Sequence, residues 1–115
     1  MPDDRRSSQF RTPSVVARAL TTTGDHFSNW RKLRGLTETQ VADRAGVSRG
    51  TVSRLEGGSG GVSLENVLRV ARALGVLDEL TRALDPFETD IGRLRAEEIL
   101  PRRVRPRRLT SRDDG

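Results

Sequence analysis

The chain has 115 residues, of which 33% are hydrophobic and 32% are charged, so it holds apolar material for one small core and not for two. It contains no cysteine, which excludes disulfides and cysteine-based zinc sites, and it has no apolar run long enough to cross a membrane. The start of the chain lacks the apolar centre of a secretory signal, which favours a cytoplasmic protein, and the net charge of +5 suits a polyanionic partner.

The first predicted helix follows a polar tail. Residues 1–19 form this tail, which is predicted to be partly helical because Pro13 occupies a position where helices can begin. Gly24 and three threonines interrupt the helical pattern, so a firm helix is predicted only over 24–34, with a turn or two before it and Gly35 as its C-terminal cap. One stripe at spacings of three and four residues is expected to face the core, and it consists of Val16, Leu20, Thr23, Phe27 and Trp30.

Two short helices with a tight turn between them are predicted next. Thr37 begins a helix over 38–45, Gly46 ends it, and Ser48 begins another over 49–56. Hydroxyl side chains cap helix N-termini, and glycine accepts the left-handed conformation that ends many helices. The residues expected to point inward are Val41, Ala42, Ala45, Val47, Val52 and Leu55.

The glycine-rich segment at 57–61 is predicted to be a flexible loop that leads into two further helices. Ser63 caps the fourth helix and Gly75 ends it, and a fifth short helix covers 76–84 before Pro86 breaks the pattern. The inward face of the fourth helix is expected to consist of Leu64, Val67, Leu68, Ala71 and Leu74.

No strand pattern occurs in the sequence, so the predicted fold is an all-α, five-helix domain over residues 20–84 with flexible N- and C-terminal tails. The C-terminal extension at 85–115 contains one more helical pattern that is expected to pack on the domain or on a partner. Residues 101–112 hold six arginines and no acid, so this basic tail is predicted to contact a polyanion; a solvated, disordered end is the alternative. The apolar residues of the extra helical pattern are Ile91, Leu94 and Ile99.

Two short helices joined by a three-residue turn that begins with glycine are typical of a helix-turn-helix. Ala42 must be small where the helices cross, and Gly46 must accept a positive φ. Val52 must be apolar to hold the crossing angle. The other inward positions are apolar as well, so the pattern strongly indicates this motif.

The helix over 49–56 also has a face expected to point outward, and that face carries no acid before Glu56. Arginine forks bind guanine, glycine lets the backbone approach a base edge, and hydroxyls bond phosphates or bases. The face is therefore predicted to contact double-stranded DNA in the major groove, and a solvated helix surface is the alternative. The predicted DNA-binding residues are Ser48, Arg49, Gly50, Thr51, Ser53 and Arg54, with Arg44 before the turn and Arg102, Arg103 and Arg105 in the basic tail.

The stretch LTETQVADRAGVSRGTVSRLEGG resembles the DNA-binding domain of the xenobiotic-response-element (phage-repressor-like) helix-turn-helix family, and the resemblance covers residues 24–84. It implies a five-helix fold, binding in the major groove, and a two-fold dimer on inverted half-sites. The dimer surface that it implies is the fifth helix, although some of that helix could instead belong to the core. The residues of this implied surface are Val76, Leu77, Leu80 and Leu84.

A narrower resemblance concerns the segments HFSNWRKLRGLT, GVSRGTVSRLEGG and VSLENVLRVARALGVLDEL, which are similar to the HipB-like antitoxin branch of that family. This resemblance implies a bacterial protein that represses its own operon. It also implies a HipA-like serine/threonine kinase toxin as a partner, which the antitoxin holds inactive.

The family resemblance also implies two features around the motif. Arg31 pairs with Glu56, which removes the negative charge of Glu56 from the DNA face. Where the family tends to have a glutamine that meets a phosphate, this chain has Glu38, which a phosphate repels. The basic residues expected to compensate are Lys32, Arg34 and Arg44.

Enzymatic chemistry has little support in the sequence. There is no cysteine nucleophile, His26 has no second ligand at a useful spacing, and the glycines at 57–61 are not followed by the lysine of a phosphate-binding loop. No catalytic residue, metal or cofactor is therefore predicted. A protein-interaction module with weak or no DNA binding stays open as a second class of function, because residues 36–57 balance three arginines with three acids.

Overall fold

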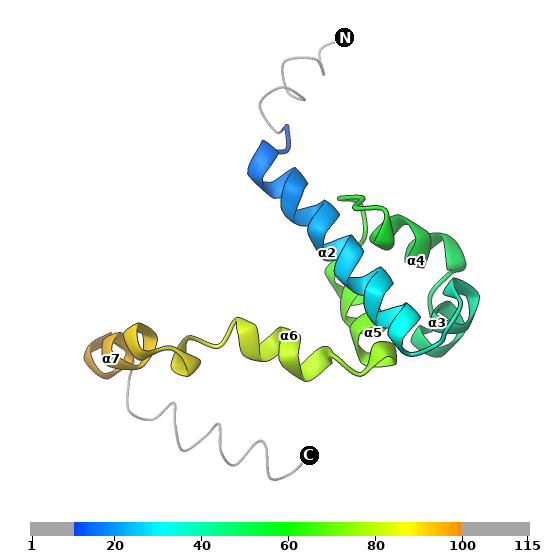
Figure 1. The fold of residues 1–115 in the computed structure, drawn as a ribbon. Helices are drawn as coiled ribbons and strands as arrows, with labels where there is room; N and C mark the ends of the chain where they lie inside the picture. The colour runs from blue at the N-terminus through cyan, green and yellow to red at the C-terminus, as the bar shows by residue number, and fades with distance from the viewer. Residues whose placement is uncertain (1–10, 100–115) are drawn as a thin grey trace. The chain divides into compact units, whose positions relative to one another are not determined.

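The computed structural model describes residues 11–99, and every element of secondary structure among them is helical (Figure 1). The predicted all-α fold class is confirmed. The chain divides into one compact unit that ends at Leu77 and a second that begins at Asp78, and each is described by itself. The helices are α2 (Ser14–Leu33), α3 (Glu38–Ala45), α4 (Arg49–Glu56), α5 (Leu64–Leu74), α6 (Leu77–Ala83) and α7 (Asp90–Ile99), with a 3-10 helix η1 at Pro86–Glu88.

Helix α2 runs unbroken for 20 residues, so the prediction of a firm helix only from residue 24 is wrong. Gly24 lies in the middle of α2 because the helix passes very close to the end of α4 there (Figure 1). A Cβ at this position would be 2.6 Å from the backbone oxygens of Leu55 and Glu56. Glycine therefore marks a close approach of two backbones, and packing on α4 offsets its low helix propensity of about 1 kcal/mol.

The buried side of α2 is shifted by one residue from the predicted stripe. Gly24 and Phe27 are buried, and Arg31 lies on the same face one turn later. Trp30, which was expected in the core, is 39% exposed, and the Arg34 guanidinium lies 5.2 Å from its ring centroid. Val16 is also exposed. An apolar stripe could not reveal the whole of this face, because only Phe27 is apolar and its other two members are a glycine and an arginine.

Helices α3 and α4 begin and end where the sequence placed them. The Thr37 hydroxyl accepts from the backbone N–H of Gln40, and the Gln40 side chain accepts from the backbone N–H of Thr37, which completes a capping box. Gly46 ends α3 with a φ of 73°, the left-handed conformation that disfavours a Cβ. The core that these helices share with α2 and α5 consists of Phe27, Val41, Ala42, Ala45, Val52, Leu55, Val70, Ala71 and Leu74.

Helix α5 packs on α3 through a face that agrees in part with the predicted one, since Ala71 and Leu74 are buried as expected. Val70, which was not expected to face inward, is fully buried, and Leu64, which was, is 71% exposed. The buried residues Val70, Ala71 and Leu74 follow the spacing of three and four residues that a helix face requires. Leu64 lies in the first turn of α5, away from this face.

Two arginines cap helix C-termini from neighbouring helices. Arg34 donates from Nε to the backbone oxygen of Leu74 at 3.0 Å, next to Gly75, where α5 ends with a φ of 80°. Arg69 donates from Nη1 to the backbone oxygen of Ala45 at 3.5 Å, where α3 ends. Both guanidinium groups satisfy carbonyls that have no partner within their own helix, and they lie at the negative end of the helix dipole. In this structure Arg34 therefore hydrogen-bonds the C-terminal end of α5, although it was expected to contact phosphate.

The glycine-rich segment at 57–61, which its composition predicts to be a flexible loop, forms a turn with backbone hydrogen bonds to the end of α4. The N–H of Gly58 donates to the backbone oxygen of Leu55, and the N–H of Ser59 donates to that of Arg54. Gly58 has a φ of 82°, and a Cβ there would be 3.0 Å from the Cα of Thr21 in α2. The glycines allow this turn to lie directly on α2.

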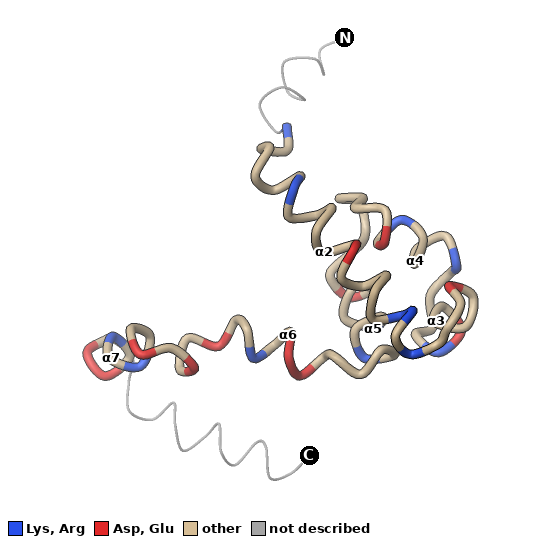
Figure 2. Tube along the Cα trace, viewed as in Figure 1, with Lys and Arg blue, Asp and Glu red and all other residues tan. Residues whose placement is uncertain are grey.

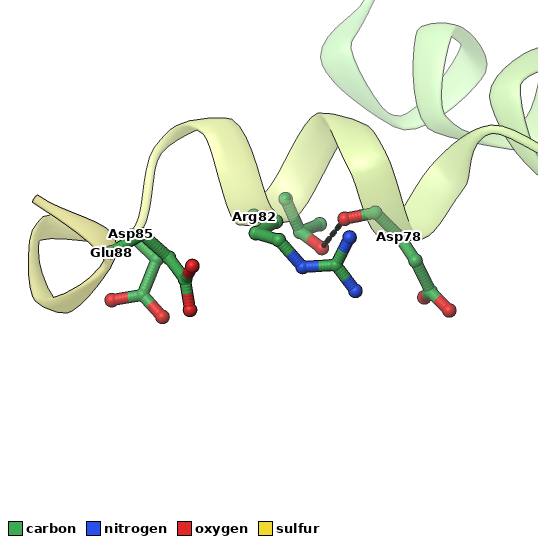
Figure 3. A pocket seen from close by; sticks show the side chains of 5 residues that line it. Asp78, Arg82, Asp85 and Glu88 are labelled. Carbon is green, nitrogen blue, oxygen red and sulfur yellow. Dashed lines mark hydrogen bonds between the residues drawn. The ribbon is translucent and has the colours of Figure 1, made fainter.

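The second unit contains α6, η1 and α7. A Cβ at Gly92 would overlap the backbone oxygen of Pro86, so this glycine lets α7 fold closely against η1. Leu84 is 81% exposed, and Ile91, Leu94 and Ile99 are exposed as well, so within this unit the apolar residues of α7 are not packed away. Figure 3 shows the acidic side chains of Asp78, Asp85 and Glu88 around an open pocket that also contains Arg82. None of the helices within residues 11–99 combines the length and hydropathy needed to span a bilayer.

Candidate nucleic-acid interface

Helix α4 is anchored on one side by the core and capped at its start. Val52 and Leu55 are buried against α2 and α3. The Ser48 hydroxyl accepts from the backbone N–H of Thr51 at 3.0 Å, and the first turn of α4 contains no acidic residue. Such an N-terminus, with unpaired N–H groups and the positive end of the helix dipole, is suited to a phosphate group.

The outward side of α4 is basic and closely approachable. Arg49, Gly50, Ser53 and Arg54 are exposed, and the side chain of Arg49 is 70% exposed. Along α4 the basic positions are separated by uncharged ones, and an acidic position comes only at the end (Figure 2). A Cβ at Gly50 would make only ordinary contacts, the nearest 3.4 Å from Nη1 of Arg54, so the fold itself does not require a glycine here.

Thr51 does not belong to the outward face, and the expectation that it projects outward is wrong. It is 7% exposed. Its hydroxyl oxygen lies 2.9 Å from Oγ of Ser48 and accepts from Nη2 of Arg54 at 3.3 Å. The threonine sits at the third position of α4, where its side chain turns back over the capping serine. Its polar character predicts a surface residue, and no pattern in the sequence indicates this burial.

A carboxylate lies next to the exposed arginine at the start of α4. Oε1 of Glu38 is 3.7 Å from Nη2 of Arg49, and the Glu38 side chain is only 22% exposed. Glu38 occupies the first turn of α3, so the turn between the two helices brings the first residues of both helices together. The sequence indicated that phosphate would repel Glu38, but it did not indicate this pairing with Arg49.

Arg31 and Glu56 form a bidentate ion pair across the junction of α2 and α4. Nε of Arg31 donates to Oε2 of Glu56 at 2.7 Å, Nη2 donates to Oε1 at 3.1 Å, and Nη1 donates to the backbone oxygen of Leu36 at 2.9 Å. The hydrogen bond to Glu56 raises the pKa of the Arg31 guanidinium above its ordinary value, although partial burial opposes this. The pair that the family resemblance implied is thus present, and the charge of Glu56 is balanced inside the fold.

The other predicted residues are placed as follows. Arg44 is exposed in the last turn of α3. Val76, Leu77 and Leu80 are half-buried. Arg102, Arg103 and Arg105 lie outside the described residues. His26 is exposed, and residues 11–99 contain no group of three or more histidine, aspartate or glutamate side chains arranged to hold a metal ion.

Comparison with known families gives one match. A family described as a helix-turn-helix domain matches residues 23–84, which is more than half of the chain and includes α3, α4 and α5 in full. Searches of curated proteins and of solved structures found no significant match.

Proposed function

Because the chain belongs to the helix-turn-helix domain family, a family of DNA-binding regulators, we propose that it reads one specific DNA sequence through the outward face of α4. The observation that carries this proposal has two parts. The exposed face of α4 has no acidic residue, and the opposite face of α4 is packed into the core. The exposed residues Arg49, Gly50, Ser53 and Arg54 stand on a helix whose other side is core. The one acid of α4, Glu56, is balanced by Arg31.

The recognition that we propose divides between phosphates and bases. Ser48 and the free N–H groups of the first turn of α4 contact a phosphate and fix the position of the helix. Arg49 and Arg54 then reach O6 and N7 of guanines in the major groove, and Gly50 lets the backbone come close to a base edge. Arg44, at the end of α3, adds a phosphate contact beside the groove. The basic residues Arg102, Arg103 and Arg105 add contacts that do not depend on sequence.

The operator that we propose is an inverted repeat bound by a homodimer. The fifth helix of the predicted domain supplies the dimer contacts through Val76, Leu77, Leu80 and Leu84. The exposure of Leu84 is compatible with this proposal, because its side chain is accessible to a second copy. Two symmetric copies of α4 would then meet half-sites about one helical turn apart.

The biological role that we propose is autorepression by an antitoxin that also binds a HipA-like kinase toxin. The resemblance to HipB-like antitoxins supports this role. The exposed apolar residues of α7, Ile91, Leu94 and Ile99, support it as well, since they give the second unit a surface that a protein partner can cover.

The competing function is a protein-interaction module that binds DNA weakly or not at all. The charge balance of α3 and α4 favours it, because three arginines and three acids between residues 36 and 57 leave little net attraction for phosphate. The competing function predicts binding of a partner protein without a preferred DNA site.

A mobility-shift titration on the DNA upstream of the protein's own gene separates the two functions. Arg49→Ala and Arg54→Ala should each weaken binding of the preferred site by about 1–3 kcal/mol and relax one base preference. Arg95→Ala, which removes an exposed arginine from α7, is the matched control and should bind like the wild type. Unchanged binding by both α4 variants would show that α4 does not read DNA.

A further inference from the structure

Thr51 is a buried polar residue that lies between Gly50, which is exposed, and Val52, which is apolar and buried. Within the described part of the chain, Thr51 is the one residue with a polar side chain that is buried. Burying a hydroxyl costs free energy unless it is hydrogen-bonded, and valine would fill the same space without that cost. The hydroxyl of Thr51 therefore calls for an explanation beyond packing.

Of the side-chain hydrogen bonds at this hydroxyl, the one with Arg54 has a fixed direction, and the one with Ser48 can run either way. Arginine has only donors, so Nη2 of Arg54 donates to Oγ1 of Thr51 at 3.3 Å. The proton of the Thr51 hydroxyl can then donate to Oγ of Ser48 at 2.9 Å. The backbone N–H of Thr51 also donates to that oxygen, at 3.0 Å. When Thr51 is the donor in its pair with Ser48, both acceptor positions of the Ser48 hydroxyl are filled, and the Ser48 proton is left to donate away from the helix.

We infer that Thr51 is a positioning residue for DNA recognition, which holds Arg54 toward a base edge and keeps Ser48 as a donor to phosphate. This inference rests on the proposed function. Phosphate oxygens only accept hydrogen bonds, so a serine that retains a free proton matches them. Arg54 loses less side-chain freedom on binding when one of its nitrogens is already held. Thr51 itself contacts no base in this arrangement.

A hydroxyl that only strengthens the helix cap would behave differently. Its removal would lower the stability of the fold, and it would weaken all DNA sequences alike. A positioning role is distinguished by a change in base preference at one position of the site, the position that Arg54 reads.

The experiment uses the full-length chain and a preferred site selected from random duplex DNA. Thr51→Val removes the hydroxyl and keeps the volume, Thr51→Ala is a second variant without a hydroxyl, and Thr51→Ser keeps the hydroxyl. Affinity is measured for the preferred site and for duplexes with single base changes. In Thr51→Val and Thr51→Ala the preference at one position should fall by about threefold to tenfold, the worth of one hydrogen bond. Thr51→Ser should keep the wild-type preference.

The same substitution in an Arg54→Ala background tests whether Thr51 acts through the arginine. Thr51→Val should then change the base preference no further, because the group that it positions is absent. The inference is overturned if the folded Val and Ala variants keep the wild-type preference, or if Thr51→Val lowers it equally with and without Arg54. A wild-type protein that selects no site at all would overturn the proposed function, and with it this role of Thr51.

Discussion

The charge at Glu38 bears directly on the strength of DNA binding. Its carboxylate lies 3.7 Å from Arg49, at the end of α4 that is expected to approach the phosphate backbone. In the free protein the pair is partly exposed, so it adds no more than about 1 kcal/mol to stability. On DNA we expect the same carboxylate to repel phosphate and to compete with bases for Arg49. Glu38 is therefore expected to lower affinity for every sequence, so that selectivity would come from the base contacts.

Neutralising this carboxylate should strengthen DNA binding. Glu38→Gln keeps the shape of the side chain and removes its charge, so affinity for preferred and random duplexes should both rise by about twofold to fivefold at low salt. Fluorescence anisotropy with labelled duplexes measures the change. Glu97→Gln, an exposed glutamate of α7, is the charge-matched control. Equal gains in the two variants, or no gain in Glu38→Gln, would show that Glu38 has no special position relative to DNA.

At the scale of the elements, the sequence predicted the caps well and the packing faces less well. Thr37, Ser48 and Gly46 mark helix ends by local chemistry, so the bounds of α3 and α4 followed from neighbouring residues. Gly24 by itself predicts an interrupted helix, because the segment that it packs against, the end of α4, is distant in sequence.

Contacts that depend on the tertiary structure also limited the prediction of the DNA face and of the packing face of α5. The exposed positions of α4 followed from helical spacing around its apolar residues. The burial of Thr51 did not follow, since it depends on the path of the capping serine and on Arg54. In α5, Leu64 and Val70 are equally apolar, and only the contact with α3 decides which is buried.

Replacing two helical glycines by alanine should have opposite effects on the stability of the fold, because only Gly24 lies where α2 and α4 approach closely. Gly24→Ala should destabilise the fold by about 1–3 kcal/mol, because the added methyl meets backbone oxygens that cannot move aside freely. Gly50→Ala has only ordinary contacts, so it should stabilise the fold by up to about 1 kcal/mol through helix propensity. Urea unfolding followed by circular dichroism compares the two. A stabilised Gly24→Ala variant would contradict the close packing of these helices.

At the scale of the whole molecule, the helix-turn-helix motif and the exposed apolar side chains of α7 belong to different units. The unit that ends at Leu77 contains the motif, the core and the arginine ion pair with Glu56. The unit that begins at Asp78 carries exposed apolar side chains on α7 and an acidic pocket (Figure 3). This division suits a regulator that binds DNA with one part and a protein partner with the other.

The central claim is that the outward face of α4 meets DNA, and backbone amide chemical shifts test it most directly. The isotope-labelled, full-length protein is titrated with a duplex from upstream of its own gene and with a scrambled duplex of equal length. The largest shift changes should fall on residues 48–54 with the upstream duplex, and they should be smaller with the scrambled one. Residues of α7 should change little with either. Changes that leave residues 48–54 unaffected while the duplex is bound would contradict the claim.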